Sequence, residues 1–117
     1  MTLFDVSNLI FALFSIGLGA IGWLAPRYVM GVLDTAPTKS SMGVSEVRAS
    51  AGALFVGLGV GAVLVGTSDA YAILGAAWMG AAVGRVTSII LDGPTPKKWG
   101  FFICEVVVGL GALAINL

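Results

Sequence analysis

The sequence predicts an all-α polytopic membrane protein: an antiparallel bundle of four transmembrane helices with a short interfacial helix after the first span. Three observations predict this fold. The 117-residue chain is 58% hydrophobic and only 10% charged, with a mean hydropathy of +1.04. A soluble domain of this length leaves too much of its surface exposed to hide so much apolar area. The apolar residues also form long runs of about 20 residues, which is the length that crosses a bilayer. We therefore treat residues 1–117 as a single integral membrane domain.

The first span is expected over residues 3–25. Pro26 ends it, because proline lacks the N–H that continues a helix, and Arg27 suits the membrane interface. No basic segment precedes this span, which indicates a retained helix and not a removed signal peptide. In the connection that follows, Tyr28 and Val32 share one side at helical spacing, which predicts the short interfacial helix.

The second and third spans are expected over residues 45–66 and 70–91. In both, small residues recur at every fourth position, a pattern that lets two membrane helices approach closely. We therefore expect these spans to form a tight antiparallel hairpin through two matching seams. The seam residues are Ala49, Ala53, Gly57 and Gly61 in the second span, and Ala72, Ala76, Gly80, Gly84 and Ser88 in the third.

The fourth span is expected over residues 99–117, after a turn that contains a glycine and two prolines. Glu105 is the one charged residue inside it. By steps of four, three and four residues, Glu105 shares a helix face with Gly109, Ala112 and Asn116. We expect this face to point toward the interior of the bundle.

The basic residues predict an orientation. All six lie on the side of the expected loops 26–44 and 92–98, and none lies on the side of the two termini. Because positive charge is enriched in cytoplasmic loops, these loops are expected in the cytoplasm and both termini in the periplasm of a bacterial inner membrane. The six residues are Arg27, Lys39, Arg48, Arg85, Lys97 and Lys98.

Four charged residues, Glu46, Arg48, Arg85 and Glu105, lie within or at the edge of the apolar runs. All are expected at a similar depth in one leaflet. An unpaired ion costs roughly 2.5–3.5 kcal/mol at the bilayer centre, so two acids and two bases at one depth predict an intramembrane polar cluster. The simplest pairs are Arg85 with Glu105, and Arg48 with Glu46 or Glu105. This cluster either fixes the helix register or forms a pocket for a lipid or quinone headgroup, an anion or a small substrate.

The composition argues against an enzyme and against a cofactor or metal site. The chain contains no histidine and one cysteine, Cys104. The usual metal ligand, the usual proton shuttle and a Cys-x-x-Cys redox pair are therefore missing. No nucleophile with a neighbouring base is visible, and Cys104 is better interpreted as a buried small apolar residue. Without a basic stripe outside the membrane loops, nucleic acid is not expected as a partner.

A set of short motifs resembles a known group of proteins. The motifs are Glu46-Val-Arg48-Ala, Gly84-Arg85-Val-Thr-Ser88, Asp92-Gly93 and the glutamate of the last span, Glu105. Together they resemble a family of small four-helix bacterial membrane proteins of unassigned function, loosely grouped with the DoxX-like proteins. This resemblance implies a four-helix antiparallel bundle with a short helix after the first span. Some DoxX-like proteins accompany membrane oxidoreductases, but this sequence has no redox residues of its own.

The sequence favours a non-catalytic role as an accessory, assembly or stabilising subunit of a larger membrane complex, respiratory or photosynthetic. Short loops and the lack of room for a soluble module support this hypothesis. The expected partners are membrane lipids and other membrane subunits, or further copies of the chain. The alternative is a lipid-, quinone- or small-molecule-binding protein, or a transporter component, that uses the polar cluster as its site.

Overall fold

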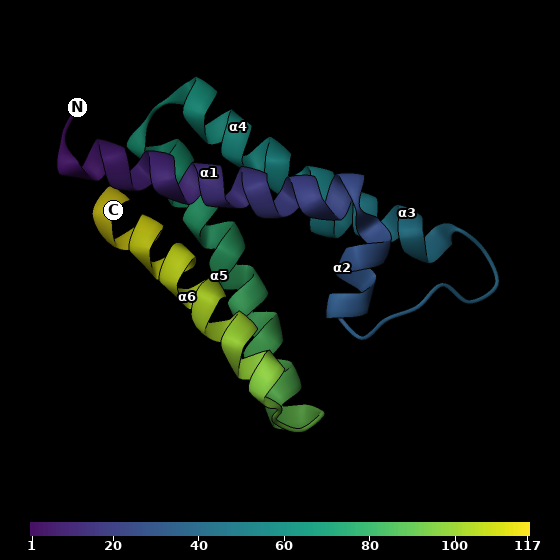
Figure 1. The fold of residues 1–117 in the computed structure, drawn as a ribbon. Coiled ribbons are helices and arrows are strands. Elements are labelled where there is room, and N and C mark those ends of the chain that lie inside the picture. Colours follow the sequence, from purple (N-terminus) through teal and green to yellow (C-terminus); the bar gives the residue numbers. More distant parts are fainter. The chain divides into compact units, whose positions relative to one another are not determined.

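The structure, a computed structural model, describes all 117 residues and is entirely helical, with 84% of the residues in helices and no strand (Figure 1). Four helices are long and apolar enough to cross a membrane: α1 (Leu3–Leu24), the helix Met42–Val65, α5 (Ser68–Leu91) and α6 (Pro96–Asn116). The helix Met42–Val65 consists of α3 (Met42–Arg48), the π-helical turn η1 (Ala49–Ala53) and α4 (Leu54–Val65). The predicted all-α fold with four potential spans is therefore confirmed.

The residues group into two compact units. The first unit contains Met1–Phe11 and Val65–Leu117, and the second contains Ala12–Leu64. The first unit thus holds the start of α1 together with α5 and α6. The second holds the rest of α1, the short helix α2 (Pro26–Val32), α3, η1 and most of α4. The single domain over residues 1–117 stays a prediction, and each unit is described separately below.

In the first unit, α5 and α6 form an antiparallel hairpin. Threonine side chains cap both helices: Thr67 Oγ1 accepts a hydrogen bond from the N–H of Ala70, and Thr95 Oγ1 accepts one from the N–H of Lys98. Between the helices, Gly93 adopts a φ of 97°, a left-handed conformation that ends α5 at little steric cost. The turn predicted from glycine and proline is therefore present, but it is shorter than the expected residues 92–98, because α6 already begins at Pro96.

The two helices of this hairpin approach closely at glycines. A Cβ built on Gly75 would lie 2.9 Å from Ala112 Cβ and 3.0 Å from the backbone nitrogen of Leu113, and one built on Gly109 would lie 2.8 Å from the backbone nitrogen of Met79. Residue numbers thus rise along α5 as they fall along α6, which makes the pair antiparallel. The buried residues of α6 are Glu105, Val108, Gly109 and Ala112.

In the second unit, α1 packs against the helix Met42–Val65. A Cβ on Gly19 would lie 2.6 Å from the carbonyl oxygen of Gly52, and a Cβ on Gly59 would lie 2.6 Å from that of Ala12. These helices are therefore antiparallel too. Ser15, fully buried, donates a hydrogen bond of 2.9 Å from Oγ to the carbonyl oxygen of Phe55.

Pro26 separates α1 from α2. It stands at the first position of α2, where its missing N–H costs nothing, after Ala25 leaves the helical conformation with φ −129° and ψ 59°. The short helix predicted after the first span is thus present as Pro26–Val32, with Pro26 and Met30 buried. The second potential span begins at Met42 and not at residue 45, and the fourth begins at Pro96 and not at residue 99.

The four glycines of the predicted seams are not among the glycines at which helices approach closely within either unit. A Cβ added to Gly57, Gly61, Gly80 or Gly84 would meet nothing within 4 Å. The physical reason is helix geometry: a four-residue step rotates by about 40° beyond a full turn, so a stripe of such steps drifts around the helix. In α5 the stripe begins at the buried Ala72 and reaches exposed positions at Gly80 and Gly84. The pairing of the two seams joins helices of different units and stays a prediction.

Candidate functional site

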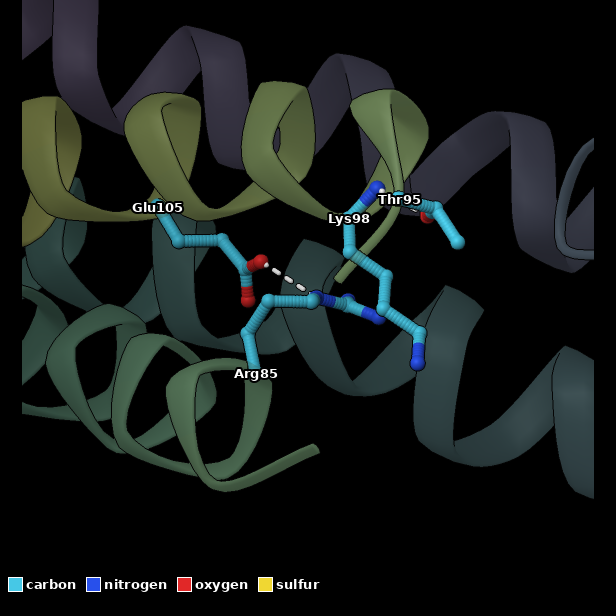
Figure 2. A network of polar contacts seen from close by, with 4 residues as sticks. All are labelled: Arg85, Thr95, Lys98 and Glu105. Carbon is cyan, nitrogen blue, oxygen red and sulfur yellow. Dashed lines mark hydrogen bonds and ion pairs between the residues drawn. The ribbon is translucent and has the colours of Figure 1, made fainter. Parts of the chain in front are cut away.

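The most distinctive chemical feature is an ion pair between α5 and α6. Arg85 Nε donates to Glu105 Oε1 over 2.8 Å, and Figure 2 shows the two side chains reaching toward each other from the two helices. The Glu105 side chain is only 7% exposed, whereas that of Arg85 is 33% exposed. The ion pair that was expected because Arg85 and Glu105 lie at a similar depth in their spans is therefore present. It neutralises a carboxylate that burial would otherwise make costly.

An aromatic ring supports the guanidinium of Arg85. Its Cζ lies 5.3 Å from the centroid of the Phe101 ring, within the range of a cation–π contact. Phe101 precedes Glu105 by four residues and thus lies one helical turn closer to the α5–α6 turn. The guanidinium therefore extends from Glu105 toward the turn. Its two Nη atoms have no partner in the protein, because the only polar contact of Arg85 is made by Nε.

A lysine strengthens the turn between the two helices. Lys98 Nζ donates a hydrogen bond of 2.7 Å to the carbonyl oxygen of Gly93, directly after the end of α5. The backbone N–H of Lys98 is held by Thr95, as Figure 2 shows. Lys98, Phe101 and Glu105 follow one another by steps of three and four, so they share a face of α6. This face carries the contacts to Arg85.

Glu46 and Arg48, the other predicted members of the cluster, are exposed and lie in the second unit. Glu46 Oε1 accepts a hydrogen bond of 2.6 Å from Ser50 Oγ. Arg48 Nη1 donates one of 2.7 Å to the carbonyl oxygen of Trp23. The expected alternative in which Glu46 pairs with Arg48 is wrong, because residues two apart on a helix do not face each other. Their grouping with Arg85 and Glu105 stays a prediction.

The contact of Arg48 has a local cause. Trp23 lies in the last turn of α1, where its carbonyl group lacks a helical partner because the chain leaves the helical conformation at Ala25, before Pro26. Arg48 therefore supplies a donor that the chain itself omits. The sequence contained this signal, since a proline that ends an apolar span leaves carbonyl groups to be satisfied.

A reciprocal amide pair was not predicted. Asn8 Nδ2 donates to Asn116 Oδ1 over 3.0 Å, and Asn116 Nδ2 donates to Asn8 Oδ1 over 2.7 Å. Asn116 Nδ2 also lies 2.7 Å from the carbonyl oxygen of Ala112, and Asn8 is 7% exposed. The pair joins the start of α1 to the end of α6. Two asparagines in otherwise apolar runs were the available signal.

Sulfur and carboxylate groups do not gather into a further centre. Cys104 is a free thiol of intermediate exposure and not the buried residue that was expected. No group of three or more His, Cys, Asp or Glu residues could hold a metal ion. Among the polar contacts of the potential spans, the Arg85–Glu105 pair is the one salt bridge, and the Asn8–Asn116 pair is a reciprocal hydrogen bond between two side-chain amides.

Comparison with known proteins places the whole chain in one family. Comparisons with curated proteins and with solved structures found no match. A family model described as a domain of unknown function, DUF4345, matches residues 4–116, which include all four potential spans except Leu3, the first residue of the first span. The chain therefore belongs to the DUF4345 family.

Proposed function

We propose that this protein is a non-catalytic integral membrane protein that acts as an accessory or assembly subunit of a larger membrane complex, respiratory or photosynthetic. The observation that carries the proposal is an exposed glycine stripe on α5, formed by Gly80 and Gly84. A Cβ on either glycine would meet nothing within 4 Å. Glycines spaced by four residues allow a second membrane helix to approach closely. A helix of another subunit is the proposed occupant.

The surroundings of this stripe support association within a membrane. Ile73 and Val83, on the exposed side of α5, are 64% and 59% exposed. Thr87 Oγ1 donates a hydrogen bond of 2.7 Å to the carbonyl oxygen of Val83, so this hydroxyl needs no partner on another helix. Moreover, only 17% to 28% of the most apolar window of each potential span is buried. Lipid or partner helices must cover the remainder.

We infer the orientation from the charges. In the first unit, Arg85, Lys97 and Lys98 all lie toward the α5–α6 turn, while Asp69 lies at the opposite end of α5. In the second unit, the basic residues lie between Arg27 and Arg48. This asymmetry favours cytoplasmic loops and periplasmic termini in a bacterial inner membrane. A relationship to the DoxX-like proteins belongs to the same proposal.

Substitutions at glycines test the subunit role. Gly80→Ile together with Gly84→Ile fills the open stripe without touching the α5–α6 packing. Gly100→Ile is the matched control, because Gly100 also meets nothing within 4 Å but lies on α6. In mildly solubilised membranes analysed by blue-native electrophoresis, the double variant is expected to lose the high-mass assembly that the wild type and the control retain. An unchanged assembly in the double variant, or a wild type without partners, would refute the proposal.

The alternative role predicts a different result for a substitution of Arg85. In that role the protein binds a lipid, quinone or small molecule at the cluster of Glu46, Arg48, Arg85 and Glu105. Arg85→Ala would then remove a bound ligand while the assembly stays intact. For a subunit whose ion pair fixes the helix register, the same substitution weakens the assembly and leaves any bound quinone or other small molecule apart from phospholipid unchanged. Native mass spectrometry reports both quantities in one measurement.

A further inference from the structure

We propose that the turn end of the α5–α6 hairpin binds the phosphate of an anionic phospholipid through Arg85 and Lys98. This inference goes beyond the subunit role, because it concerns a different face of the hairpin. Its first basis is hydrogen-bonding capacity. A guanidinium carries five N–H donors, and Arg85 uses only Nε, toward Glu105. The remaining donors, on the two Nη atoms, are arranged in the fork that matches a phosphate.

The second basis is depth. α5 has 24 residues, so it is about 36 Å long, roughly 6 Å more than the hydrocarbon core of a bilayer. Arg85 precedes the helix end at Leu91 by six residues, or about 9 Å. Because its guanidinium stacks on Phe101 and is directed toward the turn, the charged group lies nearer the lipid phosphates than its Cα does. A lipid headgroup can therefore reach it.

The third basis is the positive net charge at the turn end of the α5–α6 hairpin. Arg85, Lys97 and Lys98 carry three positive charges, and Asp92 and Glu105 carry two negative ones, which leaves a net charge of +1. Figure 2 shows Arg85 rising from α5 and Lys98 descending from α6. The Lys98 ammonium uses one donor for Gly93 and keeps two.

The negative charges at this end are already engaged. Asp92 Oδ2 accepts from Ser88 Oγ at 3.0 Å, and Glu105 is paired with Arg85. The exposed Trp99, which follows Lys98, is of the residue type that sits at headgroup level. A basic site between two membrane helices, with an exposed tryptophan next to Lys98 in the sequence, matches anionic lipid recognition.

The test compares phosphatidylglycerol with phosphatidylcholine, titrated into the purified full chain in detergent and followed by native mass spectrometry. The wild type is expected to prefer phosphatidylglycerol about tenfold, equal to about 1.4 kcal/mol. Arg85→Gln combined with Glu105→Gln removes the site without a change of net charge and without leaving a buried carboxylate unpaired. This double variant is expected to lose the preference. Glu105→Gln alone, which leaves the guanidinium in place, is expected to keep it.

A second, milder comparison remains informative if the double variant does not fold. Lys98→Gln and Arg27→Gln each remove one positive charge, but only Lys98 belongs to the site. We expect a loss of about threefold for Lys98→Gln and no loss for Arg27→Gln. Equal losses, or a double variant that keeps its preference, would overturn the proposal.

Two further experiments distinguish a phospholipid from free phosphate, and the lipid site from the subunit role. In the first, inorganic phosphate is added to the protein in the presence of phosphatidylcholine, and then to the protein with phosphatidylglycerol. Phosphate that binds in the first sample and displaces phosphatidylglycerol at equal concentration in the second would assign the site to free phosphate and overturn the lipid assignment. The Gly80→Ile/Gly84→Ile variant is expected to keep the lipid preference while its assembly is lost. Failure of the subunit role is thereby distinguished from failure of the lipid site.

Discussion

Two glycines of α4, Gly57 and Gly59, allow the helix packing to be tested by the same chemical change at neighbouring positions. Alanine in place of glycine within a helix stabilises by about 0.5–1 kcal/mol, because glycine has more conformational freedom to lose. At Gly57 nothing opposes this gain, since a Cβ there meets nothing within 4 Å. Gly57→Ala is therefore expected to raise the free energy of unfolding by about 0.5–1 kcal/mol.

At Gly59 the same change meets α1. The new Cβ would lie 2.6 Å from the carbonyl oxygen of Ala12 and 2.7 Å from Ile16 Cγ1. A backbone carbonyl cannot turn aside as a flexible side chain can, so the two helices must separate. Overpacking of this kind costs about 1–3 kcal/mol. Gly59→Ala is therefore expected to be less stable than Gly57→Ala by about 1–3 kcal/mol.

The assay is unfolding by sodium dodecyl sulfate of protein held in dodecyl maltoside, followed by far-ultraviolet circular dichroism. The first unit offers a repeat of the comparison, because a Cβ on Gly75 meets Gly109 and Ala112 while one on Gly80 meets nothing. Equal shifts for Gly57→Ala and Gly59→Ala, or a stabilised Gly59→Ala, would refute the packing of α1 against α4 described above.

Three further predictions concern the polar contacts, and the same unfolding assay checks each. Arg48→Ala removes an exposed hydrogen bond to the Trp23 carbonyl group and should cost about 0.5–1.5 kcal/mol, whereas Arg27→Ala, its control, should cost almost nothing; equal costs would contradict the capping role. Substituting both Asn8 and Asn116 by leucine in a double-mutant cycle should give a coupling of about 0.6–1.7 kcal/mol, and a coupling of zero would exclude a stabilising amide pair. Arg85→Leu should destabilise more than Glu105→Leu, because it strands a carboxylate that is 7% exposed; the reverse order would argue against the pair.

The success of the sequence predictions depended on the periodicity used. For the last span, steps of four, three and four placed Glu105 on one face with Gly109 and Ala112, and all three are buried. Alternating steps follow the 3.6-residue turn, so they stay on one side of a helix. The repeated four-residue steps of the seams drift by about 40° each. In α5 the residues at these steps therefore pass from a buried position at Ala72 to an exposed one at Gly80.

Other features depend on contacts that a single sequence does not display. The Arg85–Glu105 pair was predictable, because two opposite charges at one depth of a membrane have few other partners. The π-helical turn Ala49–Ala53 was not, since its residues carry no helix-breaking signal and Gly52 lies directly against Trp23 of α1. Charge counting alone could not find the contacts of Glu46 with Ser50 and of Arg48 with Trp23, because their partners carry no charge.

The amide pair between Asn8 and Asn116 has a consequence for biogenesis. Its partners are separated by 108 positions, so α1 enters the membrane long before α6 is synthesised. During that interval the Asn8 amide has no partner within the nascent chain and must be held by water, by lipid headgroups or by the insertion machinery. Arrival of α6 releases it from that environment. The pair thus forms only when α6 is in place, so it links the first and the last helix segments of the first unit.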